Sequence, residues 1–188
     1  EHPVKKAKDI PYFKGPGGLP GLTVQISARE QLTKRLLDSE TAMLYVPVHI
    51  LAEDARLCQI LANRGRCAAV LPRVVHDDEL PRLISRLHTV RSLGIRDALV
   101  GNIGLMIPAK EAGFRLRGDF GLNIFNSASA NVCRDLKLAS ATVSFEMTLP
   151  QIRDLSKAVN MQTIVCRRLP LMIAEQCLIK NKAGECGC

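Results

Sequence analysis

The sequence predicts an α/β protein in which parallel strands alternate with helices, as in a (β/α) barrel of about seven units, one short of a closed barrel. Short apolar, β-branched segments recur from Leu22 onward, and a polar turn and a segment with helical periodicity follow each of them. Strands that are apolar throughout and separated by single helices pair in parallel, because each crossover covers one face of the sheet. An open doubly wound sheet fits the same pattern and stays an alternative.

The first half of the chain supplies three units. Ser27 and Glu30 have the spacing of a capping box, which starts a helix. Asp77 is expected to cap a later helix, and Gly65 and Gly94 suit the left-handed turn that ends one. The expected strands and helices alternate over residues 22–27, 28–39, 42–50, 52–65, 67–75 and 77–94.

The second half continues the alternation and ends on a strand. Thr148 and Gln151 again match a capping box. The expected strands cover residues 97–104, 114–121, 140–147 and 162–172, and the expected helices cover residues 105–113, 127–137 and 149–159.

The domain organisation follows from composition. Residues 1–22 are rich in Lys, Gly and Pro without apolar periodicity, and we interpret them as a linker or arm. Residues 23–188 form one barrel domain with a cysteine-containing tail. With about seven strands, the barrel is expected to be a piece of a larger protein, completed by residues 1–22, by a downstream strand or by another chain, or else to self-associate through its unpaired sheet edges.

Charge and hydropathy restrict the partners. The formal net charge of +8 favours phosphate-bearing partners, of which RNA is the obvious candidate, although a merely soluble basic surface is equally compatible. No apolar run approaches the roughly 20 residues that cross a bilayer, so no membrane partner is expected and the cytoplasm is the expected location.

Polar side chains stand where several predicted strands end. The carboxyl ends of parallel strands share one rim, so these side chains are expected to converge on a ligand. We predict catalytic roles for Asp119, Glu146 and Arg168, and ligand-binding roles for Arg73, Asn102 and Asn123.

A structural interpretation of the same residues is kept beside this one. In it, Asn123, Asn126 and Ser127 cap the following helix, Asp119 pairs with an arginine, and nothing is bound. Capping is preferred for Asn126 and Ser127, and a binding site is preferred for Asp119, Glu146 and Arg168.

Three motifs occur in order: GDFGLNIFNS at 118–127, ATVSFEMTLPQIRDLS at 141–156 and RRLPLMIAEQC at 167–177. With them, residues 22 to 188 resemble the collagenase-like peptidase family U-32, specifically the second, carboxyl-side region of its long bacterial members. The resemblance implies a TIM-type barrel that follows a preceding barrel of the same polypeptide. It also implies a family labelled as proteases, some of whose members are oxygen-independent hydroxylation proteins acting on RNA or quinone precursors.

Those hydroxylation proteins carry an iron–sulfur cluster held by cysteines. By resemblance, Cys177 is one ligand position, but Pro170 stands where cluster-bearing relatives have another cysteine. Cys177, Cys186 and Cys188 are the candidate ligands, and free thiols in the tail are the alternative. The cysteines expected to be buried and inert are Cys58, Cys67 and Cys133.

Proteolysis has little support outside the family label. The chain has no HExxH helix and no Gly-x-Ser-x-Gly elbow, and His49 and His76, which follow strands, are more simply loop histidines. Three hypotheses therefore stand: a rim that binds a small anionic ligand or RNA and supports cluster-dependent hydroxylation, a peptidase, and a non-catalytic module that docks to the preceding barrel.

Overall fold

The computed structural model describes residues 10–15, 19–169, 181–182 and 184. These residues form a seven-stranded sheet with the order β1-β2-β3-β4-β5-β6-β7, and all neighbouring strands are parallel. The strands are β1 (Thr23–Gln25), β2 (Met43–Pro47), β3 (Cys67–Val70), β4 (Asp97–Val100), β5 (Arg115–Gly118), β6 (Ser140–Thr142) and β7 (Asn160–Gln162). The order never reverses, as it would in a doubly wound sheet, so the predicted barrel topology is confirmed and the alternative is wrong.

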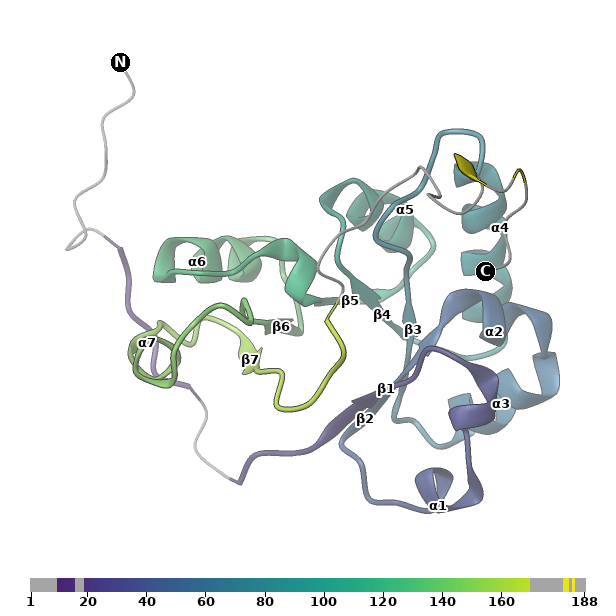
Figure 1. The fold of residues 1–188 in the computed structure, drawn as a ribbon, viewed down its shortest axis with the longest axis horizontal. Coiled ribbons are helices and arrows are strands. Elements are labelled where there is room, and N and C mark those ends of the chain that lie inside the picture. Colours follow the sequence, from purple (N-terminus) through teal and green to yellow (C-terminus); the bar gives the residue numbers. More distant parts are fainter. Residues whose placement is uncertain (1–9, 16–18, 170–180, 183, 185–188) are drawn as a thin grey trace.

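Helices connect the strands and cover the outer side of the curled sheet (Figure 1). The α-helices are α1 (Lys34–Leu37), α2 (Val48–Glu53), α3 (Ala55–Asn63), α4 (Leu80–Ser92), α5 (Met106–Glu111), α6 (Ser127–Asp135) and α7 (Leu149–Asp154). Three short 3-10 helices add η2 (Arg29–Gln31), η3 (Ile103–Leu105) and η4 (Phe120–Leu122). No helix in the part of the chain that the structure describes is long and apolar enough to cross a bilayer.

Alternate strand residues serve two different apolar clusters, because successive side chains of a strand point to opposite faces. Leu44 and Val46 of β2 belong to the main core between the sheet and the helices. Met43 and Tyr45 of the same strand belong to a smaller cluster with Leu99 on the inner face. Burial on both faces explains why these strands are apolar throughout.

The sheet curls into a half-barrel that stays open between β1 and β7. No ladder joins these two strands in the described part of the chain. The Tyr45 hydroxyl of β2 donates to Oε1 of Gln162 in β7 at 3.0 Å, and Nη1 of Arg167 donates to Oε1 of Gln25 in β1 at 3.0 Å. These side-chain hydrogen bonds draw the two edges together, and the expected incomplete barrel is confirmed.

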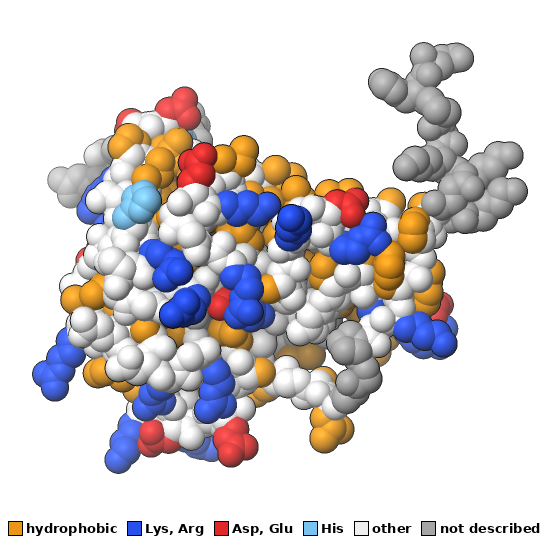
Figure 2. All heavy atoms as spheres, turned by 180° about the vertical axis from the view of Figure 1, so that it is seen from behind, with side chains coloured by type: hydrophobic (Ala, Val, Ile, Leu, Met, Phe, Trp, Pro, Cys, Tyr) orange, Lys and Arg blue, Asp and Glu red, His pale blue; other side chains and the backbone are white. Residues whose placement is uncertain are grey.

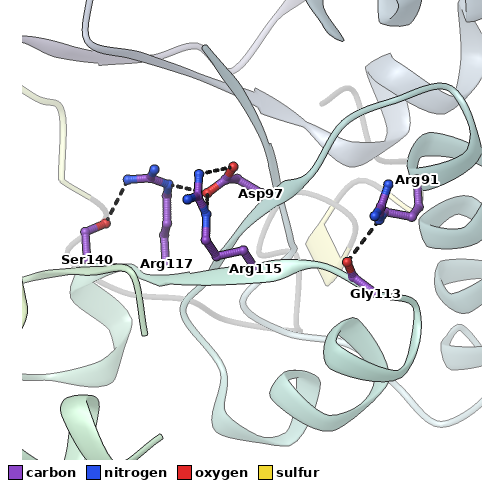
Figure 3. A network of polar contacts seen from close by, with 6 residues as sticks. All are labelled: Arg91, Asp97, Gly113, Arg115, Arg117 and Ser140. Atoms are coloured by element: carbon purple, nitrogen blue, oxygen red, sulfur yellow. Dashed lines mark hydrogen bonds and ion pairs between the residues drawn. The ribbon is translucent and has the colours of Figure 1, made fainter. Parts of the chain in front are cut away.

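An ionic network ties β4, β5 and β6 together on the inner face (Figure 3). Arg115 donates two hydrogen bonds of 2.8 Å to the buried carboxylate of Asp97. Arg117 donates to the same carboxylate at 2.8 Å and to the Ser140 hydroxyl at 3.2 Å. The buried carboxylate is therefore paired from two sides, which offsets the cost of its desolvation.

Two predicted glycine stops are confirmed, and two predicted helix starts are wrong. Gly65 and Gly94 adopt φ values of 68° and 105° after α3 and α4. Helix α4 begins at Leu80 rather than near Asp77, and Glu79 instead accepts a hydrogen bond from the backbone of His76 at 3.1 Å.

At the first helix, Gln31 rather than Glu30 closes the turn. Its side-chain Oε1 accepts from the backbone N–H groups of Ser27 and Ala28 at 2.7 and 3.1 Å. In contrast, the Thr148 cap is confirmed, because Gln151 Oε1 accepts from its backbone N–H at 2.8 Å. A helix start depends on one side-chain hydrogen bond. Where two neighbouring residues can both make it, the sequence does not tell which one does.

A seventh strand is present, but the predicted bounds 162–172 are wrong over residues 163–169, because β7 (Asn160–Gln162) ends at Gln162; residues 170–172 lie outside the described residues. Its partner β6 ends at Thr142, which pairs with Gln162, so the ladder has no further partner for the β-branched residues that follow. The chain turns away after Gln162, and packing overrides the strand propensity of that segment.

Candidate functional site

An open hollow of about 350 Å³ lies at the carboxyl ends of β3, β4 and β5. The loops that leave these strands line it, as expected for the rim of a parallel barrel. Its lining residues are Arg73, Val74, Gly101, Asn102, Ile103, Gly121 and Leu122.

Two guanidinium groups stack on one buried aromatic ring beside this hollow. Cζ of Arg73, from the loop after β3, lies 4.7 Å from the centroid of Phe120, and Cζ of Arg167, from the loop after β7, lies 4.6 Å from it. Phe145, from the loop after β6, meets the Phe120 ring edge-on with centroids 5.8 Å apart. Phe120 thus brings together cations from distant parts of the sequence.

Asp119 places a carboxylate in the same cluster. It follows β5 directly and is buried, with 6% of its surface exposed. Oδ1 accepts a hydrogen bond from the Phe120 backbone at 2.8 Å, and Nη1 of Arg167 lies 4.0 Å from the same oxygen. Burial raises the pKa of Asp119, against the opposing effects of the Phe120 N–H, Arg167 and Arg73.

Gly121 allows the loops after β4 and β5 to approach one another closely. A Cβ on Gly121 would lie 2.6 Å from the carbonyl oxygen of Gly101 and 3.2 Å from Nε of Arg73. A side chain at Gly121 would therefore collide with backbone and displace the Arg73 guanidinium. The glycine after "DF" in the GDFG motif is required by this packing.

Asn102 holds the loop that carries Arg73. Its Nδ2 donates to the carbonyl oxygen of Arg73 at 3.1 Å, and its Oδ1 accepts from the Gly104 backbone at 2.9 Å. Both ends of the amide are therefore used within the rim. The contacts make Asn102 a positioning residue, and its predicted contact with a ligand stays a prediction.

The amides after Asp119 serve the backbone. Asn123 is exposed and has φ 50° and ψ 55°, the left-handed conformation that asparagine tolerates better than most residues. Asn126 caps α6 by accepting from Ser129 N at 2.9 Å, so the preferred capping interpretation is confirmed for it. Ser127 does not cap, because its hydroxyl instead accepts from the backbone of Ser156 at 3.0 Å.

The other two predicted catalytic residues lie in exposed loops. Glu146 follows β6 next to Phe145, and its backbone N–H donates to the Ser144 hydroxyl at 3.4 Å. Arg168 is exposed, and its neighbour Arg167 is the residue that contacts Asp119 and Phe120. Sequence patterning cannot separate these arginines, because both stand in an irregular loop where strand alternation has already ended.

Like Arg167, Phe120 was not singled out as a candidate site residue by the sequence analysis. An aromatic residue directly after a strand-end carboxylate, in a rim expected to contain arginines, was an available signal for cation–π stacking.

The predicted metal ligands Cys177, Cys186 and Cys188 lie outside the described residues. The described part of the chain contains no group of three or more ligating side chains that could hold a metal ion. Among its cysteines only Cys166 is exposed. The buried ones are ill suited to be thiolates, because desolvation raises the pKa of Cys58 to about 11 and of Cys67 to about 12.

The rim combines positive charge, from Arg73, Arg167 and Arg168, with exposed apolar surface. Elsewhere in the view of the whole molecule, Figure 2 shows Lys and Arg side chains gathered near the middle of one face. Each of the five loops after β3 to β7 also exposes a large apolar side chain, namely Val74, Ile103, Phe125, Phe145 and Val165.

Comparison with known protein families matches residues 55–186 to Peptidase family U32, which is more than half of the chain. The chain belongs to peptidase family U32. The U32 match contains every rim residue described above, and it confirms the family resemblance; the finer placement in a carboxyl-side region stays a prediction. A search of curated proteins gives no match. A solved structure described as "QR15, an Aldolase" is similar, with 9% identity, 76% of this chain and 77% of that chain covered, and a TM-score of 0.47.

Proposed function

We propose that the rim of this U32 domain binds a small ligand that carries a phosphate or carboxylate group. The observation that supports the proposal is the pair of guanidinium groups, Arg73 and Arg167, stacked on Phe120 at the mouth of the half-barrel. A guanidinium offers a planar set of hydrogen-bond donors that matches the oxygen atoms of a phosphate or a carboxylate. Stacking on an aromatic ring also orders the arginine side chain before the ligand binds, so less conformational entropy is lost on binding.

Asp119 adjusts the charge of the rim. When its carboxylate is ionised, Asp119 offsets one of the two arginine charges. When the carboxyl group is protonated, both positive charges are available to the ligand. The 4.0 Å separation between Arg167 Nη1 and Asp119 Oδ1 is longer than a hydrogen bond, so the guanidinium keeps donors for an incoming anion.

A reaction at this rim would use Asp119 as the acid, because its burial favours the protonated form. Glu146, exposed on the loop after β6, is the proposed base, and Arg168, exposed beside Arg167, is the proposed additional anion contact. Arg73 and Asn102 then bind and position the ligand.

RNA is the proposed macromolecular form of such a ligand. The net charge of +8 favours phosphate binding, and Phe125 and Phe145 are exposed aromatic rings in the rim loops on which bases can stack.

Iron–sulfur-dependent hydroxylation stays a proposal that depends on Cys177, Cys186 and Cys188. Of the described cysteines, Cys166 is exposed and precedes the rim residue Arg167, so it is the proposed further thiolate ligand of the cluster. A cluster, when bound, would supply single-electron transfer. Iron and sulfide analysis of protein purified without oxygen tests this, and metal-free, colourless protein would contradict it.

The family label favours peptide hydrolysis as a second candidate, with Asp119 and Glu146 as the acid–base pair. In that case Asp119→Asn and Glu146→Gln each abolish cleavage of gelatin. Unchanged cleavage by both variants would remove this rim as the active site of a peptidase.

Ligand binding at the rim is tested by calorimetric titration with inorganic phosphate, a nucleoside monophosphate and a short single-stranded RNA at fixed salt. We expect Arg73→Ala and Arg167→Ala to weaken binding about tenfold each, as for the loss of a charge-assisted hydrogen bond. Arg96→Ala is the matched control, since Arg96 is exposed at the opposite, amino-terminal end of β4. Equal binding by all three variants would contradict the proposal.

A further inference from the structure

The segment 10–15 lies in extended form along α6 and the turn after α7, on its way to β1 (Figure 1). Its backbone is bound as a peptide ligand is bound. The Phe13 N–H donates to the Ser156 hydroxyl at 3.0 Å, and the Phe13 carbonyl accepts from the Lys157 backbone at 2.8 Å. The Pro11 carbonyl accepts from Nδ2 of Asn131 at 3.0 Å.

The walls of this groove are built independently of the segment. The Ser156 N–H donates to the Ser127 hydroxyl at 3.0 Å, a contact that does not involve the segment. Lys157 bends back so that its Nζ donates to the carbonyl oxygens of Ile152 and of Leu155, the latter at 2.8 Å. The lysine stem is thereby fixed as one wall of the groove.

The segment fits this wall at two side-chain positions. A Cβ on Gly15 would lie 3.0 Å from Cγ of Lys157, so the close passage favours glycine there. The Phe13 ring lies under the guanidinium of Arg134 on α6, with 4.5 Å between Cζ and the ring centroid.

One polar atom of the groove is still unused. Oδ1 of Asn131, a residue with 8% of its surface exposed, is buried and has no hydrogen-bond partner among the described residues. A buried acceptor without a donor is costly and marks a position where an occupant with one more N–H would gain a hydrogen bond.

We propose that the groove formed by Asn131, Arg134, Ser156 and Lys157 is a peptide-docking site, filled here by the chain's own residues 10–15. Hydrogen bonds to the peptide backbone supply affinity, and the cation–π contact selects an aromatic residue two positions after the Pro11 equivalent. The ligand class is an extended Pro-x-aromatic-x-Gly peptide. The site is separate from the rim and does not depend on the function proposed for it.

The docking site is tested by supplying the peptide in trans to the full chain. Phe13→Ala weakens the internal occupant, so this variant is expected to bind a fluorescent IPYFKG peptide saturably, at least tenfold more tightly than the unaltered chain, whose own segment competes. Adding Asn131→Ala is expected to lose that binding, whereas adding Asn63→Ala, an exposed amide at the end of α3, leaves it unchanged. Equal binding by the Asn131 and Asn63 variants, or no saturation, would overturn the proposal.

Hydrogen exchange in the full chain gives a second test, which needs no added peptide. The amide of Lys157 donates to Phe13 and is expected to exchange slowly, and Ser156→Ala is expected to speed exchange of the Phe13 amide about tenfold while Ser39→Ala does not. Exchange of both amides at the rate of an exposed amide would overturn the docking of residues 10–15.

Discussion

At the scale of the residue, Asp119 shows how burial can outweigh the attraction of neighbouring charges. Its carboxylate is buried beside two arginines, yet desolvation outweighs their attraction and raises its pKa. Folding therefore places this group in a position that favours its neutral form. Such a cost in stability is the kind that a binding site at this rim, as proposed above, would carry.

Asp119→Asn is expected to raise the melting temperature at pH 7. A raised folded pKa means that the folded state holds the proton longer, so stability falls as the pH rises from 3.8, the usual pKa, through the folded pKa. Asparagine keeps the acceptor for the Phe120 N–H and removes the buried charge. Thermal unfolding between pH 3 and 8 measures this, and the gain is expected to vanish near pH 3.

The exposed Asp78→Asn is the control for that series, because its side chain lies in the loop before α4. A melting temperature for Asp119→Asn that is lower than that of the unaltered protein at pH 7 would show that arginine pairing, not desolvation, dominates.

Cys166 is expected to react faster with alkylating reagents than the other described cysteines. Cys58, Cys67 and Cys133 are buried and their pKa values are raised by desolvation, so they hold few thiolates at pH 7. Brief alkylation of the native protein, followed by peptide mapping, is expected to modify Cys166 and to spare these three. Modification of Cys67 at the same rate as Cys166 would contradict the burial.

At the scale of the element, the network around Asp97 fixes β4, β5 and β6 relative to one another. The two arginines of β5 share one carboxylate but differ in burial: the Arg115 side chain is 62% exposed and the Arg117 side chain 12% exposed. Their contributions to stability should differ for that reason, although their distances to Asp97 are the same.

Asp97→Ala is expected to lower the free energy of unfolding by about 2 to 4 kcal/mol, because it leaves the buried Arg117 without its carboxylate. Arg115→Ala is the internal comparison and should cost less than about 1 kcal/mol, as for an exposed ion pair. Urea denaturation measures both. Equal losses for the two variants would show that exposure does not govern this network.

Much of the element pattern could be predicted from the sequence, and the errors have physical causes. Continuous apolar runs such as Met43–Pro47 identified strands, and Gly65 and Gly94 marked helix ends, because these signals are local. The strand predicted over 162–172 does not extend past Gln162 in the described residues, because strand length depends on a neighbour and β6 ends at Thr142. The sequence indicated an arginine after the last strand; the structure adds Arg167 to the rim, and the role of Arg168 stays a prediction.

At the scale of the whole molecule, the half-barrel is held partly closed by side chains rather than by a ladder. Tyr45 is buried on the inner face and reaches Gln162 from the opposite end of the sheet. Among the described residues, β1 and β7 each lack a ladder partner on one side, so such cross-sheet contacts matter for the position of the rim loops.

Tyr45→Phe is expected to lower the free energy of unfolding by about 1 kcal/mol, the usual contribution of a buried hydrogen bond. Hydrogen exchange should rise more in β1 and β7 than in β3 and β4, because the contact joins the edge strand β7 to β2, the strand that pairs with β1. Tyr12→Phe, at an exposed tyrosine, is the control. A uniform rise in exchange across the sheet would contradict an edge-specific role.

The sequence by itself determined the alternation of strands and helices and the strand-end positions of Arg73, Asn102 and Asp119, because periodicity and chain order are properties of neighbouring residues. The choice between a barrel and a doubly wound sheet needed the strand order of the structure. Only the tertiary structure decided that Phe120 collects Arg73 and Arg167, that Asn102 holds a loop, and that residues 10–15 occupy a groove on α6. Those contacts join positions far apart in the chain, and their geometry depends on how tightly the sheet curls.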